Sequence, residues 1–572
     1  MSENVTVIFG LLGGLALFLY GMNNMSDALQ KAAGDKMKRI LSVLTKNPVL
    51  GAVAGAVVTA VLQSSSATTV MVIGFVSAGL MTLPQGISVI FGANIGTTMT
   101  AQLMTLKISD YIYPIIFIGF ILYFVSHSEQ VKNIGMVFFS FGLLFEGIEI
   151  MGGVMKPLAS SPFFIELMSK VYQVPVLGIL LGAGMTLIVQ SSSATIAVLQ
   201  NFASQAGPDG ISSVIGLTGA IPILLGDNIG TTITALLASI GQSKNAKRTA
   251  VAHSIFNISG SIFFALIIPW FAAVITWISP KGNEVDVISN QIANAHTGFN
   301  LICTLIWLPL LPVMVKIVTT IVRGQDSKKI VDQPRFLDDN VLSQPIPAMC
   351  LASQEIERIA DSTMILIKRL RAEFDGKKAS QVKAEDATVS EMYHSIQNLH
   401  EEIASYLSKL FSGGVVTEKQ AEQAASLLFV NNSIERIAER GSEINSKILS
   451  LKEKKKSFSE SGKKELNKCF GIIVDLLMDA MTAVKETDPE LARRVLKGKK
   501  KFQKAEKAFN KAHLTRVKQG KCNSNLTSDF SSILYGLERM ADGSAAIAEE
   551  VMDHHGFVYL EPERLLASES QV

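Results

Sequence analysis

Two short polar runs interrupt apolar stretches of the chain and carry residue types that bind small ions. QSSSATT occupies residues 63–69 and QSSSATI occupies residues 190–196. Serine and threonine hydroxyls can donate to an oxyanion or present oxygen to a hard cation, and glutamine offers both a carbonyl and an amide. Neither run contains Lys or Arg, so the site would hold an oxyanion through neutral donors together with cations such as sodium. The candidate residues are Gln63, Ser64, Ser65, Ser66 and Thr68 with Gln190, Ser191, Ser192, Ser193 and Thr195.

A second pair of motifs follows the first pair in the same order. GANIGTT at 92–98 recurs as GDNIGTT at 226–232, at an offset of 228 − 94 = 134 residues, while the QSSSAT runs are offset by 190 − 63 = 127 residues. Two strings repeated at nearly one offset indicate an internal duplication. We expect these motifs to support the site through Asn94, Thr97, Thr98, Asn228, Thr231 and Thr232, with Asp227 as a possible member.

A simpler interpretation of these motifs is that small polar residues let membrane helices approach and hydrogen-bond to each other. The duplication favours a binding site over this alternative. For Asp227 both interpretations stay open, because its counterpart in the first half is Ala93. A third echo, HxxFN at 253–257 and 296–300, favours histidines that pack or form hydrogen bonds over histidines that act as ligands.

The elements around the motifs are predicted to be short helices. Val49–Leu62 is 14 apolar residues, about 21 Å of helix, which is less than the 30 Å or so of a bilayer core. A second such arm, 70–83, follows the polar run, and Pro48 and Pro84 mark the outer ends. We therefore predict a re-entrant hairpin whose second helix begins near the serines and directs its free N–H groups toward an anion. Full spans are predicted at 5–22, 111–126, 134–151, 251–279 and 298–320.

Charge divides the chain into two parts. Residues 1–326 contain 15 of the 52 Lys and Arg residues, and the shorter remainder contains 37. We predict a membrane domain at 1–326 with repeats at about 48–151 and 175–320, a linker at 327–345 and a soluble domain at 346–560. The net charge of +3 gives no support for nucleic-acid binding. The four cysteines form no CxxC pair, and the absence of GxSxG and HExxH motifs argues against an enzyme.

The soluble part is predicted to contain about six amphipathic helices and no strands, because apolar residues recur at spacings of three and four. Three similar motifs place two carboxylates at positions i and i+4 of a helix. Like charges on one helix face repel, so a divalent metal is one explanation and a solvated face with Arg as the counter-ion is the other. The candidate ligands are Glu357 with Asp361, Glu435 with Glu439, and Glu538 with Asp542.

The paired QSSSAT and GxNIGTT motifs, with KRTAVAHSIFN at 247–257, resemble the type II sodium-dependent phosphate cotransporter family in its bacterial form. The resemblance covers roughly residues 1–320. It implies inverted repeats, with both QSSS motifs contributing to sodium and phosphate sites. The soluble part is similar to PhoU, a helical regulator of phosphate uptake, and that similarity implies a divalent or transition metal at the carboxylate motifs.

These observations together predict an all-α, polytopic membrane transporter with internal inverted repeats and re-entrant hairpins, followed by a soluble helical bundle. We expect sodium-coupled transport of inorganic phosphate across the cell (inner) membrane, with a cytoplasmic C-terminal domain that regulates it. The expected partners are phosphate, sodium and the lipid bilayer, with a homo-oligomer as a further candidate. Phosphate export, transport of another oxyanion such as sulfate, and a membrane-tethered phosphate sensor are the alternatives.

Overall fold

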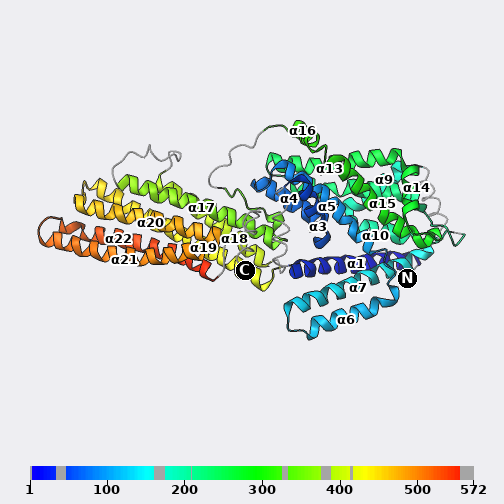
Figure 1. The fold of residues 1–572 in the computed structure, drawn as a ribbon, viewed down its shortest axis with the longest axis horizontal. Helices are drawn as coiled ribbons and strands as arrows, with labels where there is room; N and C mark the ends of the chain where they lie inside the picture. The colour runs from blue at the N-terminus through cyan, green and yellow to red at the C-terminus, as the bar shows by residue number, and fades with distance from the viewer. Residues whose placement is uncertain are drawn as a thin grey trace. The chain divides into compact units, whose positions relative to one another are not determined.

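The computed structural model describes residues 3–33, 47–159, 174–207, 209–324, 333–374, 388–412 and 416–553. Within these ranges the regular structure is helical, apart from an isolated bridge between Ala206 and Ser213. The chain divides into two compact units, the second of which spans Ser327–Tyr559 (Figure 1). Each unit is described by itself below.

The first unit begins with a long helix and two repeated groups of helices. Its elements are α1 (Glu3–Ala33), α3 (Pro48–Leu62), α4 (Ser65–Ala78), α5 (Leu83–Leu103), α6 (Ile112–Val125), α7 (Glu129–Ala159), α9 (Pro175–Val189), α10 (Ser192–Ala203), α11 (Gly216–Gly230), α12 (Thr232–Ala238), α13 (Lys244–Leu266), α14 (Ile268–Ile278), α15 (Glu284–Trp307) and α16 (Leu311–Ile321). Helices α1, α7 and α6 lie side by side (Figure 1). The group α3, α4, α5 recurs as α9, α10, α11, so the internal duplication extends from sequence to structure.

Several predicted spans differ in extent from the helices observed. Among the described residues, four helices are long and apolar enough to cross a membrane, or five if α15 and α16 count as one span bent by 86°. The predicted span 251–279 is broken after Leu266, and 298–320 is broken after Trp307. Pro269 and Pro312 stand in the first turns of the following helices, where their missing N–H groups favour a new helix over a continuous one. Gly216–Ala238, which the sequence pattern did not indicate as a span, is also long and apolar enough.

Glycines allow the first arm of each hairpin to pack backbone to backbone against the helix that carries GxNIGTT. A β-carbon on Gly92 would overlap the carbonyl group of Ala52, and one on Gly226 would overlap that of Ile179. Gly182 meets Ile223 of the facing helix in the same way. This close approach of small residues is typical of helices that associate in membranes. The glycines of the GxNIGTT motifs therefore hold α5 against α3 and α11 against α9.

The two repeats point in opposite directions. Helix α4 ends beside the start of α13, where Ser77 Oγ donates to Gln242 Oε1 at 2.8 Å and accepts from Ser243 N. Helix α10 ends beside the start of α15, where Gln200 Nε2 donates to Ser289 O at 2.9 Å.

The orientations of α13 and α15 give the sense of the repeat. Phe264 of α13 lies against Phe299 of α15, and Trp307 donates to Ser259 at 3.1 Å. As residue numbers fall along α13 they rise along α15, so these helices are antiparallel. Consequently α4 and α10 run toward opposite faces of the unit, which is the inverted arrangement that the family resemblance implied.

The second unit has six long helices in its described part, as the periodicity predicted. They are α17 (Pro345–Phe374), α18 (Val389–Ser412), α19 (Glu418–Glu453), α20 (Glu460–Glu486), α21 (Pro489–Lys518) and α22 (Thr527–Met552). Helices α17–α19 pack as one group of three and α20–α22 as another (Figure 1), and the groups meet through α17 with α20 and α19 with α22.

The predicted linker 327–345 lies partly outside the described residues, and its described part belongs to the second unit. The buried Glu355 of α17 accepts hydrogen bonds from the backbone N–H groups of Arg335 and Phe336 at 2.9 and 2.8 Å. The hydroxyl of Tyr406 donates to Asp338 O at 3.1 Å. Residues 333–344 are thus held on the helical bundle before α17 begins. The end of the predicted domain, 554–560, lies outside the described residues.

Candidate functional site

Both QSSS runs line one cavity of about 290 Å³ in the first unit. They meet there although they are 127 residues apart in the chain. From the first repeat the cavity takes Gln63, Ser64, Ser65, Ser66 and Thr97, and from the second Gln190, Ser191, Ser192 and Ser193. Leu62, Val189 and four residues of α1 complete the lining. The structure therefore brings eight predicted residues of the two runs and Thr97 together.

The two runs have the same local conformation. Gln63 and Gln190 each follow a helix and adopt left-handed backbone conformations, with φ of 51° and 54°. The next residues, Ser64 and Ser191, cap new helices by accepting hydrogen bonds from the backbone N–H groups of Ala67 and Ala194. The second helix of each hairpin consequently begins at the serines, as predicted, because serine is a strong N-cap residue.

The N-termini of α4 and α10 consequently lie at the same cavity. The first residues of α4 and α10 are Ser65 and Ser192, and both are at least nine-tenths buried. The backbone N–H groups in the first turn of a helix have no acceptor within the helix, and the helix dipole places partial positive charge there. Among the described residues that line the cavity there is no Asp, Glu, Lys or Arg. The arrangement offers an anion neutral donors from two directions, and its hydroxyl and amide oxygens remain suitable for a cation.

A pair of threonines joins the two arms of each hairpin behind the cavity. Thr59 Oγ1 donates to Thr68 Oγ1 at 2.8 Å, and Thr186 Oγ1 lies 2.9 Å from Thr195 Oγ1. In the second repeat Thr186 also donates to Asp227 Oδ1 at 2.6 Å. Thr68, Thr195 and Asp227 do not line the cavity. Their contacts make them part of the support for the turn.

The remaining residues of the GxNIGTT motifs form hydrogen bonds around the cavity without lining it. Thr98, Thr231 and Thr232 donate to backbone carbonyls three residues earlier in the chain. Asn94 Oδ1 lies 3.1 Å from His253 Nε2, and Asn228 Oδ1 accepts from Asn300 at 3.3 Å. The HxxFN motifs thus contact the asparagines of both repeats, through His253 in the first and through Asn300 in the second. His253 agrees with the expectation of a hydrogen-bonding histidine, whereas His296 is buried and its ring nitrogens have no hydrogen-bond partner among the described residues. Whether any of these residues meets an ion stays a prediction.

Sequence reasoning missed the contribution of α1. Asn23 and Ser26 line the cavity with Leu19 and Met22, and Ser26 Oγ donates to Leu62 O at the end of α3. The signal available was the polar sequence NNMS at 23–26 after an apolar run. It belongs to neither repeat, so the duplication did not direct attention to it.

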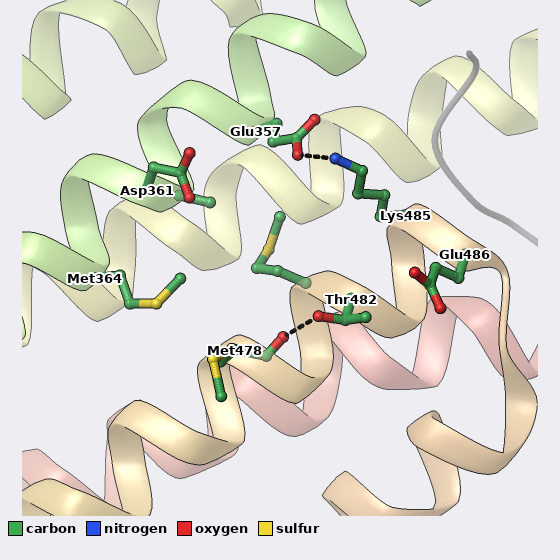
Figure 2. A pocket seen from close by; sticks show the side chains of 9 residues that line it. Glu357, Asp361, Met364, Met478, Thr482, Lys485 and Glu486 are labelled. Carbon is green, nitrogen blue, oxygen red and sulfur yellow. Dashed lines mark hydrogen bonds and ion pairs between the residues drawn. The ribbon is translucent and has the colours of Figure 1, made fainter. Parts of the chain in front are cut away.

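The carboxylate motifs of the second unit do not gather into a metal centre. Glu357 pairs with Lys485 of α20 (Figure 2), and Asp542 lies 2.8 Å from Lys499 and 3.0 Å from Arg539. Glu439 pairs with Arg440, and Glu435 accepts from the hydroxyl of Tyr393 at 3.0 Å. Within the described residues no group of three or more His, Cys, Asp or Glu side chains could hold a metal. The residues present therefore do not fit the metal that the family resemblance implied.

A pocket of about 330 Å³ lies between α17 and α20 beside the first of these motifs. Figure 2 shows Glu357 and Asp361 on α17, with Met478 and Lys485 across from them on α20. The burial of Asp361 and the nearby Glu357 carboxylate raise its pKa above the usual range. The ammonium groups of Lys485 and Lys368 act in the opposite direction on this pKa and supply counter-charge to the motif.

Comparison with known proteins gives matches in both units. The family model described as Na+/Pi-cotransporter matches residues 17–153 and 155–304, and the PhoU domain model matches residues 466–551. YjbB of Salmonella typhimurium, whose name assigns it provisionally to inorganic phosphate export, is 24% identical over 95% of this chain and 97% of its own length. Uncharacterized protein YqeW of Bacillus subtilis is 32% identical over 52% of this chain and 92% of its own length.

A third relative matches a shorter segment. The human sodium-dependent phosphate transport protein 2B is 39% identical over 98 residues, which are 17% of this chain and 14% of that protein. No solved structure matches the chain.

Proposed function

This chain belongs to the Na+/Pi-cotransporter family and carries a PhoU domain, and we propose that it couples the transport of inorganic phosphate across the cell membrane to the movement of sodium. The observation that carries the proposal is the convergence of both QSSS runs, with two helix N-termini, on one cavity whose described lining residues carry no charge. The N–H and O–H groups would bind the phosphate, and the hydroxyl and amide oxygens would bind sodium.

The electrical work of transport supports coupling for uptake. Moving a divalent anion into a compartment that is 100 mV negative costs about 4.6 kcal/mol, from about 2.3 kcal/mol per charge. A site with neutral donors contributes no protein charge to balance the phosphate, so cations that travel with it would reduce this cost. Protons are an alternative coupling ion, but they are usually relayed by ionisable groups, and the part of the cavity lining that the structure describes has none of Asp, Glu, Lys or Arg.

The orientation that we propose places the second unit in the cytoplasm of a multi-pass inner-membrane protein. Lys244, Lys247 and Arg248 at the start of α13 lie at the same face as the end of α16, because Arg248 donates to Gly324 O at 2.8 Å. The second unit follows α16 directly in the chain. Basic residues beside spans favour the cytoplasmic side. In this orientation the PhoU domain could limit transport according to the state of the cell.

Phosphate export is the second candidate function. It is favoured by the name of the YjbB relatives, which align over nearly the whole chain, and by the membrane potential, which drives an anion outward without a coupled cation. The two candidates differ in one measurable quantity, the dependence of phosphate flux on a sodium gradient.

The test uses the full-length protein in liposomes with labelled phosphate. Under the proposal, an inward sodium gradient drives uptake, replacement of sodium by choline abolishes it, and excess sulfate does not compete. Ser65→Ala and Ser192→Ala, which remove hydroxyls in the cavity, should each lower the rate. Ser254→Ala is the matched control, since its hydroxyl donates to Ala250 O within α13 and does not line the cavity. Flux that is insensitive to sodium would contradict the coupling.

A truncation separates a transporter from a membrane-tethered sensor. A chain that ends at residue 326 retains every residue of the cavity and should still transport phosphate, with altered regulation. Loss of all transport in a truncated chain that elutes as a folded protein would favour a role in which the PhoU domain is essential to the output.

A further inference from the structure

A second cavity of the first unit, of about 590 Å³, lies at the far end of α10 from the QSSS runs. We call it the vestibule. Its walls come from the end of α5, from α7, from the second half of α10 and from the start of α15. Along α10, Ser193 lines the first cavity and Ala197, about one turn later, lines the vestibule. The two cavities are therefore neighbours on one helix.

Two buried amide oxygens of the vestibule have no hydrogen-bond donor among the described residues. Gln200 is 3% exposed, and its Nε2 donates to Ser289 O at 2.9 Å and to Ser289 Oγ at 3.1 Å. Asn201 Nδ2 donates to Ile148 O at 2.7 Å. These bonds occupy the nitrogen atoms and leave Gln200 Oε1 and Asn201 Oδ1 without partners. A buried acceptor without a partner is unfavourable by about 1–3 kcal/mol, so this pair indicates that a positive or donating ligand belongs there.

The charges around the vestibule also favour a positively charged ligand. Among the lining residues that the structure describes, Glu149 and Asp286 are the acidic side chains and Lys107 is the one basic side chain, so their formal charges sum to −1. The C-terminal end of α10 also lies here, since Ser204 and Gln205 are lining residues. The C-terminus of a helix carries partial negative charge and stabilises cations. Oxygen ligands, negative charge and a helix C-terminus all favour a hard cation over an anion.

We propose that the vestibule binds a sodium ion through Gln200 Oε1 and Asn201 Oδ1, with Glu149 and Asp286 raising the local concentration of cations. Helix α10 then presents its positive end to the phosphate cavity and its negative end to the sodium site. The choice of sodium among hard monovalent cations rests on the proposed function. The vestibule lies toward the face opposite the basic start of α13, so in the proposed orientation the ion would enter from the non-cytoplasmic side.

The test measures equilibrium binding of labelled sodium to full-length protein in lipid nanodiscs, in choline medium without phosphate. The double variant Gln200→Met with Asn201→Leu keeps side chains of similar size and removes both oxygens, and we expect at least one of the bound sodium ions to bind about tenfold more weakly, equivalent to about 1.4 kcal/mol. Asn201→Asp adds a negative charge at nearly the same size and should strengthen binding.

Two controls and one reference variant complete the design. Ser204 lines the vestibule, but its hydroxyl already donates to the backbone carbonyl of Gln200, so Ser204→Ala removes no free ligand. Gln102→Met removes an amide that donates to Asn294 and Thr297 and does not line the vestibule. Both should bind sodium like the unaltered protein. The reference, Ser65→Ala with Ser192→Ala, should retain the vestibule ion.

The outcomes separate this inference from the proposed function. Unchanged sodium affinity in both the double variant and Asn201→Asp would overturn the vestibule site, even if phosphate transport is sodium-dependent. Displacement of sodium by potassium at equal concentration would support a cation site and overturn its assignment to sodium. Phosphate flux without sodium dependence, with vestibule binding intact, would overturn the proposed function alone. Size-exclusion elution identifies any variant that does not fold.

Discussion

At Gln63 and Gln190 the backbone adopts a left-handed conformation that is unusual for a residue with a side chain. Such a residue costs about 1–3 kcal/mol and persists only where its surroundings hold it in place. At Gln63 the surroundings are visible, since Thr100 donates to Oε1 at 2.8 Å and Nε2 donates to Ala60 O. Gln190 is exposed to the cavity side. Side-chain hydrogen bonds therefore hold the turn at Gln63 in the first repeat, whereas the side chain of Gln190 in the second repeat is exposed.

The threonine pairs allow a matched comparison between the repeats. Thr186→Val removes the donor to Asp227 and leaves a buried carboxylate oxygen without its partner, so we expect a loss of about 1–3 kcal/mol in the free energy of unfolding. Thr59→Val removes only a bond between two hydroxyls and should cost about 1 kcal/mol. Thermal unfolding in detergent measures both. Equal losses of unfolding free energy in the two variants would show that the hydrogen bond from Thr186 to Asp227 does not add to stability.

Glu506 of α21 gives a pH-dependent prediction for the PhoU domain. Burial and the neighbouring Glu538 carboxylate raise the pKa of Glu506. A carboxyl group whose pKa is raised in the folded state binds its proton more tightly there, so its contribution to stability falls as pH rises through the folded pKa. Glu506→Gln should therefore raise the unfolding temperature at pH 7.

The stabilisation by Glu506→Gln should disappear as the pH is lowered below the ordinary pKa of a glutamate, where the carboxyl group is protonated in both states. Glu549→Gln, at an exposed position of α22, is the control and should change stability little at either pH. A destabilising effect of Glu506→Gln at pH 7 would contradict the repulsion between the two carboxylates.

At the scale of elements, each hairpin depends on the close packing of its first arm against the helix that carries GxNIGTT. In both repeats the carbonyl groups of one helix occupy the space above the glycines of the other. The GxNIGTT motifs are predicted to support the site. Their packing against the first arm is compatible with that prediction, because it sets the position of the turn that joins the two arms of the hairpin. Thr97 then lines the cavity one turn away from the packed glycines.

Two glycines on α9 test this packing. A β-carbon on Gly182 would overlap the carbonyl of Ile223, whereas one on Gly184 would have no atom within 4 Å. Gly182→Ala should destabilise the protein by about 1–3 kcal/mol through overpacking. Gly184→Ala should be neutral or stabilise by up to about 1 kcal/mol, because alanine favours helix. The measurement is the thermal unfolding of purified protein. Similar effects at the two positions would exclude close packing of α9 on α11.

At the scale of the whole molecule, the helices of the first unit start and end on two opposite faces. Because α13 and α15 are antiparallel, the start of α13 and the loop before α15 belong to opposite faces. The same reasoning places the ends of α4 and α10 on opposite faces. A transporter with such a plan can expose one central cavity to either side by rearranging its repeats.

Cysteine labelling tests the two faces directly. Asn245→Cys and Asn283→Cys introduce thiols at exposed positions on the two faces, in a background where Cys522 is replaced by Ala. Cys303, Cys350 and Cys469 are buried. In sealed vesicles an impermeant maleimide should label Asn283→Cys from the outer side and Asn245→Cys from the cytoplasmic side. Labelling of both from one side would contradict the inverted plan, and the reverse pattern would place the PhoU domain outside.

The sequence by itself determined the duplication, the polar centres of the two hairpins, the family and the helical character of both units. These features are local patterns, since each depends on residue type and on spacing within one segment. Only the tertiary structure decided which polar residues meet. It placed the QSSS runs and Asn23 of α1 in one cavity, and Thr68 and Asn94 behind it. It also paired Glu357 and Asp542 of the PhoU domain with Lys485 and Lys499 from other helices, which the spacing of one helix could not reveal. Convergence depends on contacts between segments far apart in the chain, and no pattern within a single segment specifies those contacts.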